Sequence, residues 1–284
     1  MKAKSLIAAA LVAVTTIGLP SCTDFNPKNF SPKKRGFVDS KKWGKVVSKE
    51  LDLQDFNAIH TYSNVDIIYT QGNEYRVCVE GNEKAIECYQ IDINDGILTD
   101  QTVKNASGTI PSVRLRVTAP MLNEIKISGA GDVDIKKKSK FEALTIDISG
   151  AGDLDINSME CGKLTVEVSG AGDIKAQNIQ CSSATVSISG AGDADFRSLT
   201  STGNVEFYCS GAGDIDASVQ CPALQIKSNG AGDMDIDAEC EFIDAESSGT
   251  GHIELNGYTR ELRRSEGGLS KIDTKDLRVD KFVK

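Results

Sequence analysis

The chain has 284 residues, of which 39 % are apolar and 26 % are charged, and its formal net charge is −9. This composition is that of a folded globular protein and excludes an intrinsically disordered chain. The acidic balance argues against nucleic-acid binding, because neutralising phosphates requires clustered Lys and Arg.

The N-terminus has the features of an export signal. The basic start "MKAK" precedes the apolar run "SLIAAALVAVTTIG", which is too short to span a bilayer comfortably. Next comes "LPSC", residues 19–22, which resembles the lipobox of bacterial lipoproteins, although Pro20 departs from its commonest pattern. We expect residues 1–21 to be a lipoprotein signal peptide and Cys22 to carry the lipid that attaches the mature chain to the membrane. The alternative is an ordinary signal peptide cut nearby, with Cys22 incidental.

Residues 22–50 are predicted to be a tether that starts at the lipidated Cys22. They contain Pro27, Pro32 and many basic residues, without apolar periodicity. This basic segment is either a solvated spacer or an arm that touches anionic lipid headgroups. Residues 51–284 are then the folded domain, and within it 51–120 carry strand signals such as "NVDIIYT" and "VRLRVTAP" and one short helical stretch in "EGNEKAIECYQ". We expect irregular N-terminal coils there.

From residue 121 the chain is a repeat array. "SGAGD" occurs five times, recurs as "NGAGD" and "SGTGH", and its first glycines are 19 to 21 residues apart. In "LTIDISGAGDLDI", apolar residues alternate with polar ones on both sides of the glycines, which predicts two short strands joined by a corner. A second corner is expected near "NSMECGK". Such a repeat buries its apolar face only by stacking on its neighbours.

The fold class is therefore predicted to be all-β, a single-stranded right-handed parallel β-helix with about 20 residues per coil. Residues 121–264 are the repeats, and the more charged residues 265–284 are a C-terminal cap coil. Glycine is expected at each corner because it permits positive φ and close backbone approach. The predicted corner glycines are Gly129, Gly131, Gly150, Gly152, Gly170, Gly172, Gly190, Gly192, Gly211, Gly213, Gly230, Gly232, Gly249 and Gly251.

The cysteines follow the same period and show no zinc-ligand spacing. Cys161, Cys181, Cys221 and Cys240 fall at equivalent places after a corner and predict one buried column, broken by Ser201. Free, buried thiols are the expected state, since in-register neighbours hold their Cβ atoms farther apart than a relaxed disulfide prefers. Cys78 and Cys88 are less constrained and could pair.

The aspartates that follow the corners predict an outward, acidic column. They are structural corner formers, or else ligands of a divalent cation or a basic partner. The candidate metal ligands are Asp132, Asp153, Asp173, Asp193, Asp214 and Asp233. The motif departs from the nonapeptide calcium β-roll, so the pattern does not itself imply calcium.

No catalytic constellation is recognisable. A ladder of near-identical carboxylates gives no coil a distinct acid and base, whereas general acid–base catalysis needs two different environments. The irregular positions Lys175, Arg197, Tyr208 and His252 form no known set. We therefore predict a protein without catalytic residues and without a cofactor.

The motifs "LQDFNAI", "VDIIYTQGNEYRVCVEGNE", "DGILTD" and the glycine repeats occur in this order, and together they resemble the putative auto-transporter adhesin, head GIN domain family. The resemblance covers residues 46 to about 280. It implies an exported protein of the kind common in Bacteroidota, with a right-handed β-helix shaped like pectin lyases but without their catalytic residues.

The function expected is that of a non-enzymatic lipoprotein of the cell envelope, at the outer membrane, that acts as an adhesin or surface interaction scaffold. Its partners are then the membrane, through the lipid on Cys22, and a surface glycan or protein. The alternatives are a β-helix polysaccharide-processing enzyme and a calcium- or glycan-binding scaffold that uses the aspartates outside the corners.

Overall fold

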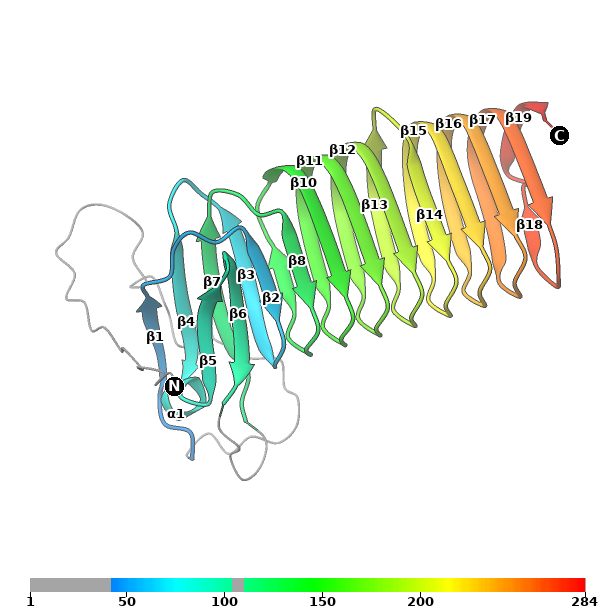
Figure 1. Cartoon of the computed structure of the whole chain (residues 1–284). Coiled ribbons are helices and arrows are strands. Elements are labelled where there is room, and N and C mark those ends of the chain that lie inside the picture. Colours follow the sequence, from blue (N-terminus) through cyan, green and yellow to red (C-terminus); the bar gives the residue numbers. More distant parts are fainter. Residues whose placement is uncertain (1–41, 104–109, 284) are drawn as a thin grey trace, which may run out of the picture.

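The computed structural model describes residues 42–103 and 110–283, which form one 19-stranded sheet and the short helix α1 (Glu83–Ile86) (Figure 1). The predicted signal peptide, Cys22 and the tether up to residue 41 lie outside the described residues. Within the described ranges, no helix has the length and apolar character needed to cross a membrane.

The larger part of the molecule is a parallel β-solenoid of about eight turns that lie roughly 20 residues apart. The predicted β-helix architecture is thus confirmed. Each strand pairs in register with its equivalent one coil later, so that Leu154 faces Ile174 and Val168 faces Ile188. The solenoid strands are β8 (Glu124–Ile127), β9 (Val133–Ile135), β10 (Ser139–Ile148), β11 (Leu154–Val168), β12 (Ile174–Ile188), β13 (Ala194–Ser201), β14 (Val205–Cys209), β15 (Ile215–Ser228), β16 (Met234–Ser247), β17 (His252–Glu266), β18 (Lys271–Asp273) and β19 (Leu277–Phe282).

The second corner of the repeat is milder than expected. β11 runs without a break through "NSMECGK", and its pairing with β12 passes over Asn157 and Gly162. The chain therefore bends there inside one continuous strand. Alternating side chains fill the interior of this coil, and they include Met159 besides the residues that the alternation predicts. The buried side chains of β11 are Leu154, Ile156, Met159, Cys161, Leu164, Val166 and Val168.

The N-terminal block combines solenoid coils with an antiparallel cap. β2 and β3 lie parallel in the stack, between β6 and β7 on one side and β8 and β9 on the other. β4 pairs antiparallel with β1 and β7, and β5 pairs antiparallel with β6. The strands of this block are β1 (Val46–Leu51), β2 (Ala58–Thr61), β3 (Val65–Gln71), β4 (Arg76–Asn82), β5 (Tyr89–Asn94), β6 (Ile97–Thr102) and β7 (Val113–Ala119).

The fold begins earlier than the expected boundary at residue 51. β1 starts at Val46, and the Trp43 side chain is buried. Pairing of β1 with β4 explains the difference, because the polar sequence of β1 gives no periodic signal but its backbone completes the cap. At the far end, β18 and β19 stack on β17 as a charged last coil (Figure 1). Charged side chains protect an exposed edge of this kind from pairing with another chain.

Candidate functional site

The corners bring glycine against the backbone of the preceding coil. A Cβ atom on Gly170 would lie 2.1 Å from the carbonyl oxygen of Gly150, a distance that real Cβ atoms do not show. Ala171 N–H donates to the same oxygen at 2.9 Å, so the corners of successive coils are bonded together. The obstacle recurs at 1.9–2.2 Å for Gly129, Gly131, Gly150, Gly152, Gly172, Gly190, Gly192, Gly211, Gly213, Gly230, Gly232, Gly249 and Gly251.

The reason for glycine is thus close approach alone. The expectation of positive φ at these corners is wrong, because the described glycines with positive φ are Gly44, Gly96, Gly257 and Gly268. A flat stack of corners leaves no room for side-chain atoms between coils, whatever the φ of the residue.

The aspartates after the corners form a ladder of hydrogen bonds along the solenoid. Asp153 N–H donates to Asp132 Oδ1 at 2.9 Å, and Asp173 N–H donates to Asp153 Oδ1 at 3.1 Å. The pattern continues through Asp193, Asp214 and Asp233 and ends at His252, whose N–H donates to Asp233 Oδ1 at 2.6 Å. Each of these carboxylates therefore serves as a corner former, accepting the N–H of the next coil.

The ladder is less uniformly outward than expected. Asp132 is buried, with 8 % of its surface exposed, whereas Asp193, Asp214 and Asp233 are exposed. The neighbouring N-terminal block covers the first coil and explains this difference. The ladder also has an earlier member that the motif did not reveal, since Asp132 N–H donates to Asp66 Oδ1 at 3.3 Å. Asp66 lacks the glycines, and "VDI" after a turn is its only sequence signal.

Replacing Asp173 with Ala should lower the free energy of unfolding by about 1 kcal/mol, because Asp193 N–H loses its acceptor. Asp173→Asn keeps an acceptor oxygen and should stay within a few tenths of the parent protein. Urea unfolding followed by circular dichroism measures both differences. Equal losses for the two variants would show that the charge of Asp173, rather than its hydrogen bond, stabilises the corner.

A second row of carboxylates, which includes Asp195, Asp216 and Asp235, lies beside the ladder. Burial raises the pKa of Asp216, and the charges of Asp235 and Asp195 raise it further. Across residues 42–103 and 110–283, no three His, Cys, Asp or Glu side chains are grouped so that they could hold a metal ion. Cation binding by the six candidate aspartates stays a prediction, to be decided by calorimetry with calcium.

The cysteines of the repeat form the expected buried column. Cys161 pairs in register with Cys181, and Cys221 with Cys240, whose sulfur atoms are 3.4 Å apart without a disulfide. Ser201 occupies the gap between the two pairs. Pairing of Cys78 with Cys88 does not occur, because Cys88 is a free, buried thiol that donates to the Lys84 carbonyl at 3.3 Å.

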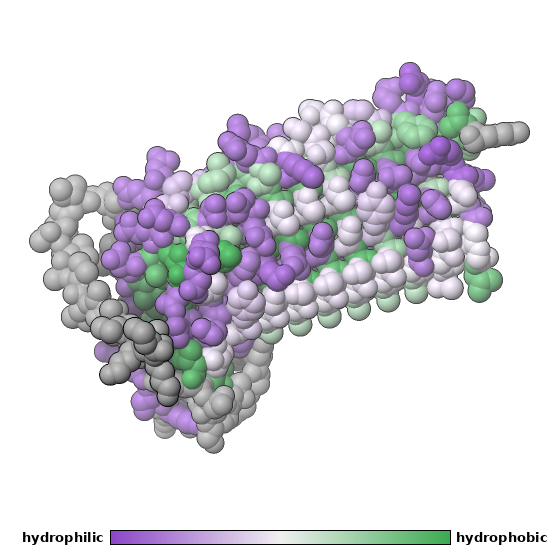
Figure 2. Space-filling view, in the orientation of Figure 1, coloured by the Kyte–Doolittle hydropathy of each residue, from purple (hydrophilic) through white to green (hydrophobic). Residues whose placement is uncertain are grey.

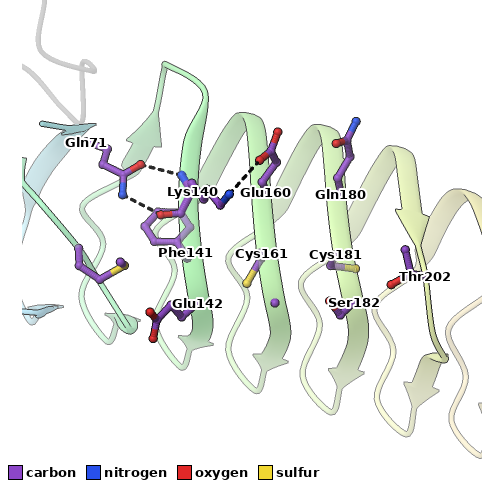
Figure 3. A pocket seen from close by; sticks show the side chains of 12 residues that line it. Gln71, Lys140, Phe141, Glu142, Glu160, Cys161, Gln180, Cys181, Ser182 and Thr202 are labelled. Atoms are coloured by element: carbon purple, nitrogen blue, oxygen red, sulfur yellow. Dashed lines mark hydrogen bonds and ion pairs between the residues drawn. The ribbon is translucent and has the colours of Figure 1, made fainter.

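A groove of about 630 Å³ crosses coils β10 to β13 (Figure 3). Cys161 and Cys181 lie in its middle, with Glu160 and Gln180 on one side and Glu142 and Ser182 on the other. Further lining residues are Gln71, Met121, Lys140, Phe141, Gly162 and Thr202. Figure 2 shows hydrophilic side chains crowded over the N-terminal block and the C-terminal end, with a paler band along the coils between them.

One end of the groove is closed by Gln71. Its amide nitrogen donates to the Lys140 carbonyl at 2.7 Å, and its amide oxygen accepts Lys140 N–H at 2.7 Å, as a backbone peptide would (Figure 3). Glu160 forms ion pairs with Lys138 and, at 3.9 Å, with Lys140. The hydrogen bond from Lys138 lowers the pKa of Glu160. Hydrogen bonds and ion pairs therefore hold polar side chains in place along the rim of the groove.

The thiols in the groove are not activated for catalysis. Burial raises the pKa of Cys161 to about 11 and also raises the pKa of Cys181. A thiol is then protonated at neutral pH, whereas a catalytic cysteine needs a lowered pKa. The irregular positions are scattered, with Lys175 and Arg197 exposed on separate coils.

The comparison with protein families decides the relationship of this chain. The family described as putative auto-transporter adhesin, head GIN domain, matches residues 55–221 and 215–283, well over half of the chain. The chain belongs to this GIN-domain family. The resemblance seen in the glycine motifs is thereby confirmed. No curated protein matches the chain.

Solved structures resemble this GIN-domain protein over most of its length. A putative adhesin from Bacteroides fragilis NCTC 9343 has 25 % identity and a TM-score of 0.63, covering 84 % of this chain and 97 % of its own. A putative adhesin from Parabacteroides distasonis ATCC 8503 has 19 % identity and a TM-score of 0.75, and the match covers 84 % of this chain and 98 % of that structure. A putative lipid binding protein from the same strain has 19 % identity and a TM-score of 0.68, and the match covers 85 % of this chain and 98 % of that structure. The last two comparisons support the fold alone.

Proposed function

We propose that this protein is a non-enzymatic, lipid-anchored adhesin of the cell envelope, held at the outer membrane through Cys22. Membership of the GIN-domain family carries this proposal, since family and neighbours are described as putative adhesins. The groove of β10 to β13 is the proposed contact surface for a surface glycan or protein. Its polar walls are held by hydrogen bonds and ion pairs, and its thiols are inert at neutral pH.

Anchoring is tested by Cys22→Ser in the native host. The parent protein should incorporate labelled palmitate and sediment with outer membranes, and the variant should do neither. Protease treatment of intact cells then reports the side on which the domain lies. Cleavage of the domain in intact cells supports direct adhesion. Protection in intact cells, with cleavage only after the cells are lysed, contradicts it.

The groove is tested with two variants that place the same bulky charge on one row of the solenoid. Gln180 lines the groove, and Gln220 occupies the same row two coils later, outside it. Gln180→Arg should reduce adherence of cells that display the protein, whereas Gln220→Arg should not. Equal adherence of both variants would rule out the groove as the contact surface.

A further inference from the structure

A second hollow, of about 280 Å³, lies on the sheet face of β14, β15 and β16 and shares no lining residue with the groove. Asn204, Ala223 and Phe242 form one row across these strands. Glu206, Gln225 and Asp244 form the next row, in register. Two strand spacings of about 4.8 Å separate β14 from β16, and the small Ala223 lies between them. The space is the size of a small ligand rather than of a protein segment.

The hollow interrupts the regularity of the repeat. Earlier coils carry Lys163 and Ser183 in the row of Phe242, and Thr165 and Thr185 in the row of Gln225. An aromatic ring, an amide and carboxylates therefore gather at one place, whereas the equivalent positions of these earlier coils carry a lysine and hydroxyl side chains. The packing of the glycine corners does not require these different side chains, because both rows lie on the flat sheet away from the corners.

The aromatic wall is held in place from behind. The Arg263 guanidinium lies 6.0 Å from the Phe242 ring centroid, and Arg263 Nε donates to Asp244 Oδ1 at 2.9 Å. A second hydrogen bond joins Arg263 Nη2 to Asp244 Oδ2. The ring is partly exposed, so it offers an apolar surface that is fixed before any ligand arrives.

The polar wall is held by Tyr208. The Tyr208 hydroxyl is 2.9 Å from Gln225 Oε1 and 3.1 Å from Glu206 Oε2, and Thr185 Oγ1 is 3.5 Å from the same Glu206 oxygen. Within the described residues, the amide nitrogen of Gln225, Glu206 Oε1 and the side chain of Asn204 make no hydrogen bond. Donors and acceptors are thus left side by side in fixed positions, as the recognition of neighbouring hydroxyl groups requires.

We infer that this hollow binds one neutral hexopyranose unit of a glycan. Phe242 contacts the C–H face of the sugar, and Asn204, Glu206 and Gln225 bond to its hydroxyls. Asp244 is neutralised by Arg263, which leaves the carboxylate of Glu206 as the uncompensated charge and disfavours acidic sugars. The inference rests on the proposed adhesin function and adds to the groove a second contact, for a single sugar unit.

Saturation-transfer NMR with galactose, glucose and mannose tests the assignment on the purified domain, with glucuronic acid as the acidic probe. At least one neutral hexose should receive saturation from the protein. Phe242→Ala should weaken its binding roughly tenfold, and Phe242→Tyr should retain it. Lys163→Ala, in the same row on a coil without the hollow, is the matched control and should change nothing.

Three results would overturn the assignment: no transfer to any neutral hexose, preference for glucuronic acid, or equal binding by the parent protein and a folded Phe242→Ala variant. Sensitivity to Gln180→Arg instead would place the sugar in the groove. Circular dichroism shows whether each variant is folded. If cells lacking the protein adhere as well as the parent cells do, the adhesin function fails, whereas the NMR result for Phe242→Ala decides the hexose site separately.

Discussion

Gly170→Ala is expected to lower the free energy of unfolding by more than about 3 kcal/mol. The added Cβ would lie 2.1 Å from the Gly150 oxygen and 2.6 Å from the Ser149 carbonyl carbon. Both are backbone atoms, so no rotation of a side chain relieves the clash. The coils must separate, and the bond from Ala171 N–H to Gly150 is lost with them.

The matched control is Gly267→Ala, in the last corner, where the sequence is "SEGG" instead of "SGAG". A Cβ there meets its nearest atoms at 3.9 Å, an ordinary contact. This variant should keep the stability of the parent protein in urea unfolding. Because each coil contacts only its neighbours, hydrogen exchange in Gly170→Ala should rise first in the coils next to residue 170. Similar losses for both variants would refute close approach as the reason for the corner glycines.

Asp100→Ala is expected to cost about 3 kcal/mol, because it removes the carboxylate that ends the stack of corners. No glycine corner of a preceding coil stacks against the corner at Tyr62 and Ser63. Asp100 instead accepts Tyr62 N–H at 3.3 Å, Ser63 N–H at 3.1 Å and the Ser63 hydroxyl. The Asp100 side chain is buried, so water cannot replace these bonds. Asp100→Asn keeps one acceptor oxygen and should lose less.

The pH dependence of the free energy of unfolding, compared between the parent protein and Asp100→Asn, gives a second measurement. Burial raises the pKa of Asp100 above its ordinary value of 3.8, despite the opposing hydrogen bonds from Ser63, Thr61 and Tyr62. The folded chain then holds the proton more tightly than the unfolded chain, so the contribution of Asp100 is greatest below pH 3.8. It declines as pH rises towards the folded pKa. Asn does not titrate, and the stability difference between parent and Asp100→Asn should therefore shrink over that window; a difference that grows would contradict it.

Several features of the site could be predicted from the repeat because they are local to it. The alternation around "SGAGD" places Leu154 and Ile156 inside, and equal spacing brings Cys161 beside Cys181. The aspartates could be identified as corner formers from their position, but their hydrogen-bond partners lie one coil away. Asp66 and Asp100 carry out related roles without the motif, and no periodic pattern points to them.

The sequence by itself determined the solenoid, its coil length, its core and the need for glycine, because a period near 20 residues permits burial of the apolar face only by in-register stacking. Only the tertiary structure decided the order of the first coils, where β6 and β7 lie before β2 and β3 in space although they follow them in the chain. The hollow at Phe242 and the groove closed by Gln71 were likewise decided there. These features depend on contacts between residues far apart in sequence, which leave no repeat or local propensity to recognise.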